Sequence, residues 1–314
     1  MTAEVHAMRF GAAFWVQRTD WPSLREAVQR AEAAGFDDLW IDDHLLSDEA
    51  EWPDPKFEGW TTLAAVAAVT ERAHLGLMVG ANTLRNPGLV AKMATTVDHV
   101  SGGRAILGLG AGWFEREHAA FGFDFGSGFG ERLDRLVEAV PLIRRLLDGE
   151  EVTHHGRFYA FDRAVCAPRP VQARLPILIG GSGPRKTIPL IARSADMWNA
   201  YGTPAQLSDT DALLRAACAA AGRDEREVER TVNLNCVIRA DRAAAEVAWD
   251  AWYRVHNPHG GEGRLDAGGS VADVAATLHG FREVGFAHPV LIFRSPWDHA
   301  TIERLPDLRA ALEA

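Results

Sequence analysis

The stretch that decides the fold runs from residue 74 to residue 110 and reads HLGLMVGANTLRNPGLVAKMATTVDHVSGGRAILGLG. Two short and mostly apolar runs, His74–Gly80 and Arg104–Gly110, flank a longer amphipathic run, Pro87–Val100. Short apolar runs predict buried strands, and the amphipathic run predicts a helix whose first turn accommodates Pro87. A strand, a helix and a second strand in this order predict a parallel β-α-β unit.

The same alternation continues on both sides of this unit. Together, the apolar runs predict eight strands, at Met8–Val16, Asp38–Ile41, His74–Gly80, Arg104–Gly110, Pro176–Gly181, Asp196–Ala200, Val232–Ala240 and Pro289–Phe293. The amphipathic runs predict helices at Trp21–Ala34, Thr61–Arg72, Pro87–Val100, Gly130–Leu147, Pro184–Ser194, Pro204–Ala221, Arg242–Trp252, Val271–Val284 and His299–Leu312. This pattern favours an α/β fold closed into a (β/α)8 TIM barrel, forming one domain over residues 1–314. An open, doubly wound sheet remains the alternative, because the sequence does not show that the two edge strands meet.

Two segments interrupt the alternation and are expected to be insertions. Glu150–Leu175 follows the fourth strand, and His256–Gly269 follows the seventh. Both are expected to be irregular, and long irregular segments in a compact domain are usually functional or mobile loops.

Charge and composition exclude several classes of protein. The 33 Lys and Arg residues against 43 Asp and Glu residues give a net charge of −10, which disfavours binding to nucleic acids and anionic membranes. The three cysteines are far apart and form no CxxC pair, so neither a disulfide framework nor a cysteine zinc site is expected. The sequence has neither a signal peptide nor an apolar run of membrane-spanning length, which predicts a cytoplasmic protein.

If the strands close into a barrel, chemistry belongs at their carboxyl ends. Asp42-Asp43-His44 follows the second strand, and a histidine there can act as a general acid or base. The alternative is that the two aspartates cap the next segment and His44 is a surface residue. Gly80 ends the third strand, where a glycine permits close approach of a ligand or forms an ordinary turn.

Two glycine-rich segments follow the fourth and fifth strands. The segment that begins Gly108-Leu109-Gly110 is not a dinucleotide fingerprint, because Trp113 stands where that motif needs its third glycine. The small residues Gly110, Ala111 and Gly112 beside an aromatic side chain nevertheless suit a flat ring. Gly180-Gly181-Ser182-Gly183 is not a P-loop, because Arg185 stands where that motif needs glycine. Its amides, the following helix start and the cations Arg185 and Lys186 still predict an anion site. A plain glycine turn with solvated cations is the alternative.

Other histidines are weaker candidates. His154-His155 and the pair His256 and His259 have no carboxylate or cysteine partners at ligand spacing, so no metal site is expected.

Taken in order, the strand-end segments resemble the bacterial luciferase-like flavin and deazaflavin oxidoreductases. The resemblance covers residues 8–200 and is carried by Trp40–His44, Glu58–Leu63, Asn86–Met93, Asp98–Arg104, Gly108–Trp113, Pro176–Gly183 and Ser194–Asn199. It looks most like the branch that uses coenzyme F420, a deazaflavin that transfers hydride.

The resemblance implies roles for individual residues. His44 would serve in acid–base chemistry, Asp43 and Asn82 would contact the deazaflavin, and a non-prolyl cis peptide at Val79-Gly80 would form a bulge behind its ring. The loop Gly180, Gly181, Ser182 and Gly183 resembles the family's phosphate clamp. Relatives that act on glucose 6-phosphate have a glutamate where this chain has Trp113, so the proton acceptor is left unassigned.

The implied function is hydride transfer between C5 of F420 and a small organic substrate. An FMN-dependent monooxygenase and a non-catalytic flavin-binding protein are the alternatives. Trp15, Trp60 and Trp113 are expected to form walls of an apolar substrate pocket. Because members of the resembled family often form dimers, a homodimer is also expected.

Overall fold

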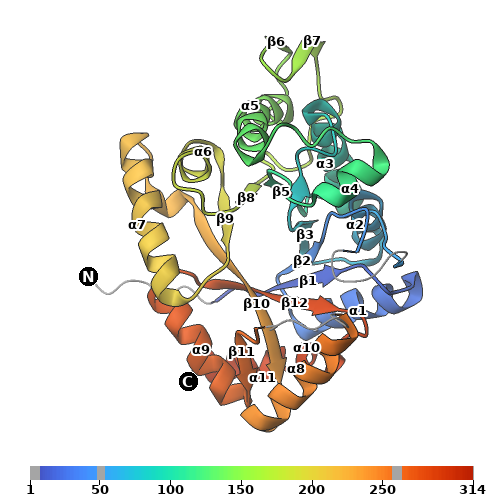
Figure 1. Ribbon diagram of the computed structural model, residues 1–314, viewed down its shortest axis with the longest axis vertical. Coiled ribbons are helices and arrows are strands. Elements are labelled where there is room, and N and C mark those ends of the chain that lie inside the picture. The colour runs from blue at the N-terminus through green and yellow to red at the C-terminus, as the bar shows by residue number, and fades with distance from the viewer. Residues whose placement is uncertain (1–7, 48–53, 257–263, 314) are drawn as a thin grey trace.

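The computed structural model describes residues 8–47, 54–256 and 264–313. Eight parallel strands form the barrel seen in Figure 1, and they are β1 (Gly11–Trp15), β2 (Asp38–Ile41), β3 (His74–Leu77), β5 (Ala105–Gly110), β8 (Ile177–Gly180), β9 (Met197–Ala200), β10 (Glu229–Ile238) and β12 (His288–Arg294). The short strand β4 (Gly80–Ala81) continues the line of β3, and β11 (Ala267–Gly269) pairs with β10 outside the ring.

Two pairings close the ring. Gly11 on β1 is in register with Val290 on β12, and Thr231 on β10 is in register with Asn199 on β9. The sheet therefore has no free edge between β12 and β1 or between β9 and β10. The predicted TIM barrel is confirmed, and the open doubly wound sheet is excluded.

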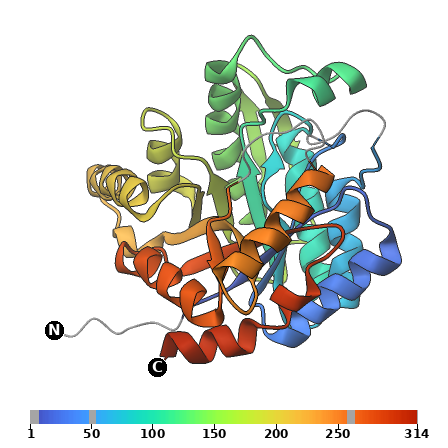
Figure 2. The same ribbon diagram turned by 60° about the horizontal axis from the view of Figure 1, so that its bottom comes forward.

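Helices cover the outside of the barrel (Figure 2). They are α1 (Trp21–Ala34), α2 (Gly59–Val69), α3 (Pro87–Ser101), α4 (Glu115–Phe121), α5 (Phe129–Leu147), α6 (Thr187–Ser194), α7 (Pro204–Ala220), α8 (Arg242–His256), α9 (Val271–Glu283), α10 (His299–Ile302) and α11 (Leu305–Glu313), with a 3₁₀ turn, η1, at Glu225–Glu227. Helix α1 has the predicted bounds and caps: Asp20 accepts the Ser23 amide at 2.8 Å, and Gly35 ends it in the left-handed conformation at φ 96°.

Alternate side chains of each strand enter different cores. On β2, Leu39 and Ile41 pack outward against the helices, while Trp40 lies inside the barrel. The indole of Trp40 needs glycine on both neighbouring strands, because a Cβ on Gly11 or Gly76 would lie only 2.9 or 2.7 Å from it. These glycines are thus explained by packing inside the barrel.

The strand expected at His74–Gly80 is divided into β3 and β4. Three further predicted segments also differ from the structure. The segment Glu150–Leu175 is not wholly irregular, because β6 (Val152–His155) and β7 (Ala160–Ala164) pair as an antiparallel hairpin beside α5. The helix expected from Pro184 begins only at Thr187, after a turn. The last helix is split, because Pro306 lacks an N–H and fits the first turn of a new helix, α11.

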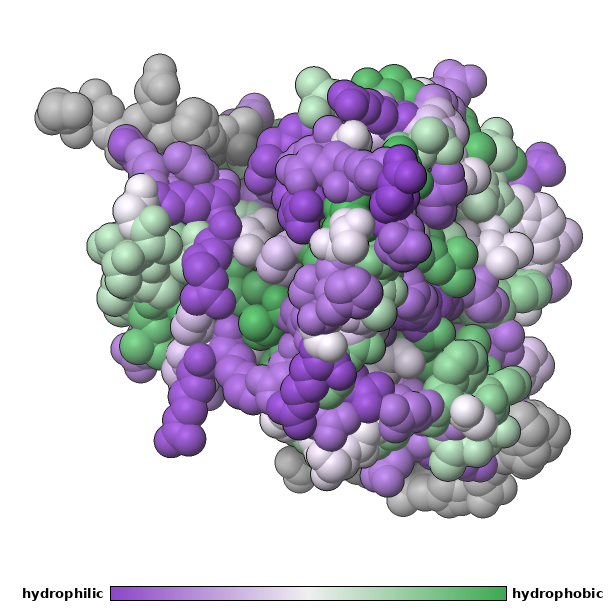
Figure 3. Space-filling view, turned by 90° about the horizontal axis from the view of Figure 1, so that it is seen from above, coloured by the Kyte–Doolittle hydropathy of each residue, from purple (hydrophilic) through white to green (hydrophobic). Residues whose placement is uncertain are grey.

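The insertion after the seventh strand is described only in part. Its residues 264–269 contain β11, and His259 lies outside the described residues. Seen from the end of the molecule that bears the hairpin, hydrophilic side chains cover much of the surface and hydrophobic ones form separate patches (Figure 3). None of the helices described is both long and apolar enough to cross a bilayer.

Candidate functional site

A cavity of about 500 Å³ opens at the carboxyl ends of the barrel strands. The residues that line it come from all eight barrel strands or the loops after them and from helices α5 and α6, and they are Trp15, Asp42, Asp43, His44, Met78, Val79, Ala81, Gly110, Ala111, Gly112, Trp113, Phe129, Leu133, Gly180, Gly181, Ser182, Gly183, Thr187, Asn199, Tyr201, Asn233, Asn235, Ile292 and Arg294. The structure therefore brings together most of the residues singled out from the sequence, although they lie on separate segments of the chain.

His44 is paired with a carboxylate that the sequence did not identify. Nδ1 of His44 lies 3.1 Å from Oε1 of Glu117 in α4, and the other oxygen of Glu117 accepts the Leu45 amide at 2.7 Å. The carboxylate thus fixes both the ring and the backbone that carries it. The Nε2 atom of His44 has no hydrogen-bond partner among the described residues, so it is available to a ligand in the cavity.

The surroundings of His44 favour its protonated form. Burial by itself lowers the pKa of His44, but the hydrogen bond to Glu117 and the negative charges of Asp42 and Glu117 outweigh it, so the pKa is raised. The rings of Trp113 and Phe114 contact the imidazole edge-on, with centroids 5.3 and 5.8 Å away. An imidazole held by a carboxylate and screened by aromatic rings can donate or accept a proton at the cavity wall.

The carboxylate that pairs with His44 lies one helical turn after Trp113 in the sequence. Position 113 is occupied by a tryptophan, and the carboxylate of Glu117 reaches His44 from the first turn of α4. No sequence pattern distinguishes Glu117 from Glu115, since both belong to a helix outside the predicted ones and only the fold shows that Glu117 is the buried one.

The carboxylate of Asp43 holds neighbouring segments of the barrel together. Arg85 holds both of its carboxylate oxygens, at 2.7 and 2.9 Å, and the amide of Ala81 donates to it at 2.9 Å. Arg85 also pairs with Glu58, which caps the start of α2. Complete burial raises the pKa of Asp43, against the opposing charge of Arg85. Asp43 thus ties the end of β2 to β4, and it lines the cavity at the same time.

The cis peptide bond lies one residue earlier than expected, between Met78 and Val79. The expected position, Val79-Gly80, is therefore wrong, and Gly80 lies in β4, where it pairs with Leu109. The side chain of Val79 fills the space above two glycines. A Cβ on Gly110 or Gly180 would lie 2.7 or 3.1 Å from it, which explains why both strand ends carry glycine.

The loop after β8 presents backbone donors to the cavity. The amide of Gly181 donates to the Asn199 carbonyl at 3.0 Å, whereas no acceptor is found for the amides of Ser182 and Gly183 within the described residues. Both precede the N-terminus of α6, whose Thr187 also lines the cavity. Free N–H groups next to a helix N-terminus are a favourable place for an anionic group.

The cations next to this loop behave differently from the prediction. The side chain of Lys186 turns away from the loop toward α5. There its Nζ pairs with Asp134 and donates to the Gly130 carbonyl at 2.9 Å. Arg185 is exposed and does not line the cavity. Any anion in this place is therefore held by backbone amides and the helix end rather than by Lys186.

A network of asparagine side chains on β9 and β10 was not predicted from the sequence. Asn199 donates to Asn233 at 2.8 Å and to Thr231 at 2.9 Å, and Asn233 donates to the Tyr201 hydroxyl at 2.7 Å. Asn233 and Asn235 are two residues apart on β10 and so point to the same side of the strand. This alternation was the available signal, because asparagine is uncommon inside a strand.

Three of the expected site residues do not line the cavity. Trp60 is 4% exposed and packs in the core between helices and barrel, since it lies in the first turn of α2 and faces the barrel wall. Asn82 is buried and donates to the Tyr159 hydroxyl at 3.0 Å, which anchors the hairpin loop. Gly80 is buried within β4. Trp15 and Trp113 do line the cavity, and the Arg294 guanidinium lies 3.6 Å from the centre of a Trp15 ring.

No metal site is found in the part of the chain that the structure describes. His154, one of the histidines considered from the sequence, instead lies 3.2 Å from Glu138 of α5, whose carboxylate also accepts amides of the hairpin loop.

Several known proteins are similar to this chain in sequence or in fold. The F420-dependent glucose-6-phosphate dehydrogenase of Kineococcus radiotolerans is 30% identical over 307 residues, which cover 87% of each chain. The F420-dependent hydroxymycolic acid dehydrogenase of Mycobacterium tuberculosis is 34% identical over 239 residues, covering 75% of this chain and 63% of that protein. Among solved structures, an F420-dependent secondary alcohol dehydrogenase in complex with an F420-acetone adduct has the same fold, with a TM-score of 0.84 at 22% identity, and the match covers 97% of this chain and 99% of that one.

The profile of one family spans most of the sequence, from residue 4 to residue 284, and its description is luciferase-like monooxygenase. The resemblance inferred from the strand-end motifs is confirmed, and the chain belongs to the luciferase-like monooxygenase family.

Proposed function

We propose that the protein is an F420-dependent oxidoreductase that moves a hydride between C5 of the deazaflavin and a small organic substrate. The observation that carries the proposal is the pairing of His44 with Glu117 in the same cavity as the free amides of Ser182 and Gly183. One feature supplies a proton-transfer group and the other a place for an anionic tail.

The cavity fits such a cofactor. One side of the cavity, made by Gly110, Ala111 and Gly112, has no bulky side chain, and the Val79 side chain packs against Gly110. A planar ring against this side and an anionic tail at the 180–183 loop would use the small residues and the free amides together. Coenzyme F420, when bound, accepts or donates a hydride at C5.

The residues of the chain would then handle the proton. A secondary alcohol that becomes a ketone loses a hydride from carbon and a proton from its hydroxyl, and ketone reduction needs both in return. His44 lines the cavity, and its Nε2, which has no hydrogen-bond partner in the described part of the chain, would accept or return that proton. Glu117 would hold the ring in place and stabilise its protonated form. We choose an alcohol because both similar relatives are named dehydrogenases, one of them of hydroxymycolic acid.

An FMN-dependent monooxygenase is the second candidate. The same side of the cavity and the same amide loop would accept FMN, whose ring is also flat and whose tail also ends in phosphate. The description of the family as luciferase-like monooxygenase supports this second candidate.

Titration of the purified protein with F420 and, separately, with FMN distinguishes the candidates. Cofactor binding is followed by quenching of tryptophan fluorescence, since Trp15 and Trp113 line the cavity. We expect saturable quenching by F420, and loss of the F420 absorbance when a secondary alcohol is added without oxygen. Binding of FMN alone would refute the F420 assignment, and binding of neither cofactor would refute both candidates.

A further inference from the structure

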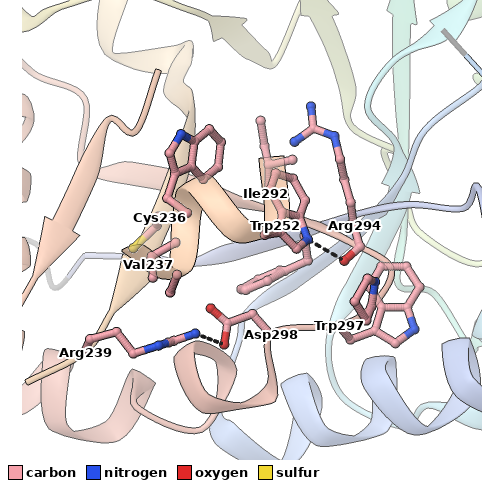
Figure 4. A pocket seen from close by; sticks show the side chains of 12 residues that line it. Cys236, Val237, Arg239, Trp252, Ile292, Arg294, Trp297 and Asp298 are labelled. Atoms are coloured by element: carbon pink, nitrogen blue, oxygen red, sulfur yellow. Dashed lines mark hydrogen bonds and ion pairs between the residues drawn. The ribbon is translucent and has the colours of Figure 1, made fainter. Parts of the chain in front are cut away.

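A second cavity, of about 240 Å³, lies next to the first, and Figure 4 shows the side chains that line it. It is a partly open pocket lined by the ends of β10 and β12, the turn after β12 and one face of α8. Most of its lining is apolar and aromatic, as Val237, Ala248, Trp249, Trp252, Phe293 and Trp297 show. Trp249 and Trp297 are each at most 9% exposed, so these indoles pack in the cavity wall and barely contact solvent.

The charged groups at the edge of this cavity already have partners. Arg239 pairs with Asp298 at 3.0 Å, and the other oxygen of Asp298 accepts the Thr301 hydroxyl at 2.6 Å. Burial raises the pKa of the Cys236 thiol well above its usual range, so this group stays neutral. Apart from Arg294, which lies in the wall shared with the first cavity, the charged residues that line this cavity neutralise each other, and an apolar group would lose least on entering it.

The two cavities share a wall. Ile292 and Arg294 of β12 line both of them. The Arg294 guanidinium lies 3.6 Å from a Trp15 ring centre on the side of the first cavity and 5.2 Å from a Trp252 ring centre on the side of the second. The Trp252 indole also donates to the Arg294 carbonyl at 3.4 Å, as Figure 4 shows. The two cavities are therefore neighbours, with Ile292 and Arg294 between them.

We propose that the second cavity holds an apolar group of the substrate, about the size of one aromatic ring, while the carbon that exchanges hydride lies in the first cavity. This inference rests on the proposed function. A dry cavity of about 150 Å³ lined by apolar side chains is enough to bind benzene, so a cavity of this size accommodates one ring with a short substituent. The substrates preferred by this protein would then be aryl-substituted alcohols and ketones rather than sugars or short aliphatic alcohols.

Substitutions on α8 test the inference. Ala248→Phe would fill the second cavity, because Ala248 lines it. Val247→Phe is the matched control, since Val247 is the preceding residue of the same helix and is 70% exposed. Ala248→Leu fills less of the cavity and guards against misfolding of the bulkier variant. None of these positions lines the first cavity.

The first readout is binding of toluene, followed by calorimetry on the F420-loaded protein. We expect the wild type and Val247→Phe to bind toluene, Ala248→Leu to bind it more weakly, and Ala248→Phe to show no binding. Toluene binding that is absent in the wild type, or unchanged in Ala248→Phe, would overturn the inference. Unchanged F420 affinity in all three variants shows that the barrel is intact.

The second readout is selectivity, the ratio of kcat/KM for 1-phenylethanol to that for 2-propanol. Because the phenyl ring would lose its apolar surroundings, we expect this ratio to fall by about tenfold or more in Ala248→Phe and to stay unchanged in Val247→Phe. An equal ratio in both variants contradicts a role in substrate binding. If the wild type fails to bind F420 at all, the proposed function is refuted separately, whatever toluene does.

Discussion

The carboxylate of Glu117 lies 3.1 Å from Nδ1 of His44, although 73 residues separate the two in the chain. Glu117 comes from the first turn of α4 and His44 from the loop after β2, so only the closed barrel brings them together. Because Glu117 also accepts the Leu45 amide, a single buried carboxylate orients the histidine and its backbone. Such an arrangement fixes which ring nitrogen faces the cavity.

Replacement of Glu117 by glutamine tests this relationship. The hydrogen bond and the charge of Glu117 raise the pKa of His44, so their loss should lower that pKa. If neutral His44 accepts the proton during alcohol oxidation, the acidic limb of the kcat–pH profile should move to lower pH, and kcat should fall by about tenfold. Glu115→Gln is the control, because Glu115 is exposed on the same helix. An unmoved limb would exclude coupling between the two groups.

His44 itself is the proposed proton-transfer group. We expect His44→Ala to lower kcat by about 100-fold or more, the usual contribution of a general acid or base, while F420 affinity changes little. Steady-state kinetics and fluorescence titration separate these two effects. His155→Ala serves as the control, since His155 is exposed on the hairpin. Full activity of His44→Ala would remove His44 from the mechanism.

The anion site predicted at the 180–183 loop can be tested with one charge. Ser182→Asp puts a carboxylate next to the free amides, and Ser182→Asn is a control of the same size without the charge. We expect Ser182→Asp to raise the Kd for F420 by about tenfold at low salt, because like charges would lie only a few ångströms apart. The effect should weaken as ionic strength rises. Equal affinities of the two variants would show that the cofactor tail lies elsewhere.

Stability at alkaline pH should depend on a histidine at the opposite end of the barrel. His288 is buried between Asp38, at 2.7 Å, and Glu229, at 2.8 Å, with Arg9 and His74 also facing Asp38. Burial alone lowers its pKa, but the two carboxylates outweigh burial and raise it to about 9. The stabilisation is therefore complete below the unfolded-state pKa of 6.5 and is lost as pH rises to about 9.

A shift from about 6.5 to about 9 corresponds to roughly 3 kcal/mol of unfolding free energy. Urea denaturation between pH 6 and pH 10 measures this decline, which His288→Gln should flatten. In the acid range the same cluster acts with the opposite sign, since the pKa values of Asp38 and Glu229 are lowered and their contribution is lost as they become protonated. A wild-type curve that is flat above pH 6.5 would show that His288 is not charged in the folded protein.

Close packing at the end of β5 should make Gly108 intolerant of substitution. A Cβ at this position would lie 1.9 Å from the Leu77 carbonyl oxygen and 3.5 Å from Val79. We expect Gly108→Ala to lower the unfolding free energy by about 3 kcal/mol or more, since the backbone of β3 would have to move. Gly130→Ala, on an open face of α5, should change it by no more than about 0.5 kcal/mol. Thermal melts of both variants make the comparison.

The order of the elements followed from the sequence alone. Strand β2 and helix α1 have the predicted bounds, because hydrophobic periodicity and caps such as Asp20 and Gly35 are local properties of the chain. The strand-end positions of His44 and Gly180 followed as well, since parallel strands of a barrel all end at the same face. Local patterns thus determined the fold class and the neighbourhood of the site.

Tertiary structure decided the rest. Whether β12 meets β1, which glutamate of α4 reaches His44, and whether Lys186 faces the loop or Asp134 all depend on contacts between distant segments. Trp60 illustrates the limit, since its type suits a pocket wall and a core equally well, and only the packing of α2 buries it. Periodicity reports which residues become buried but not what they are buried against, and that pairing is what makes a site.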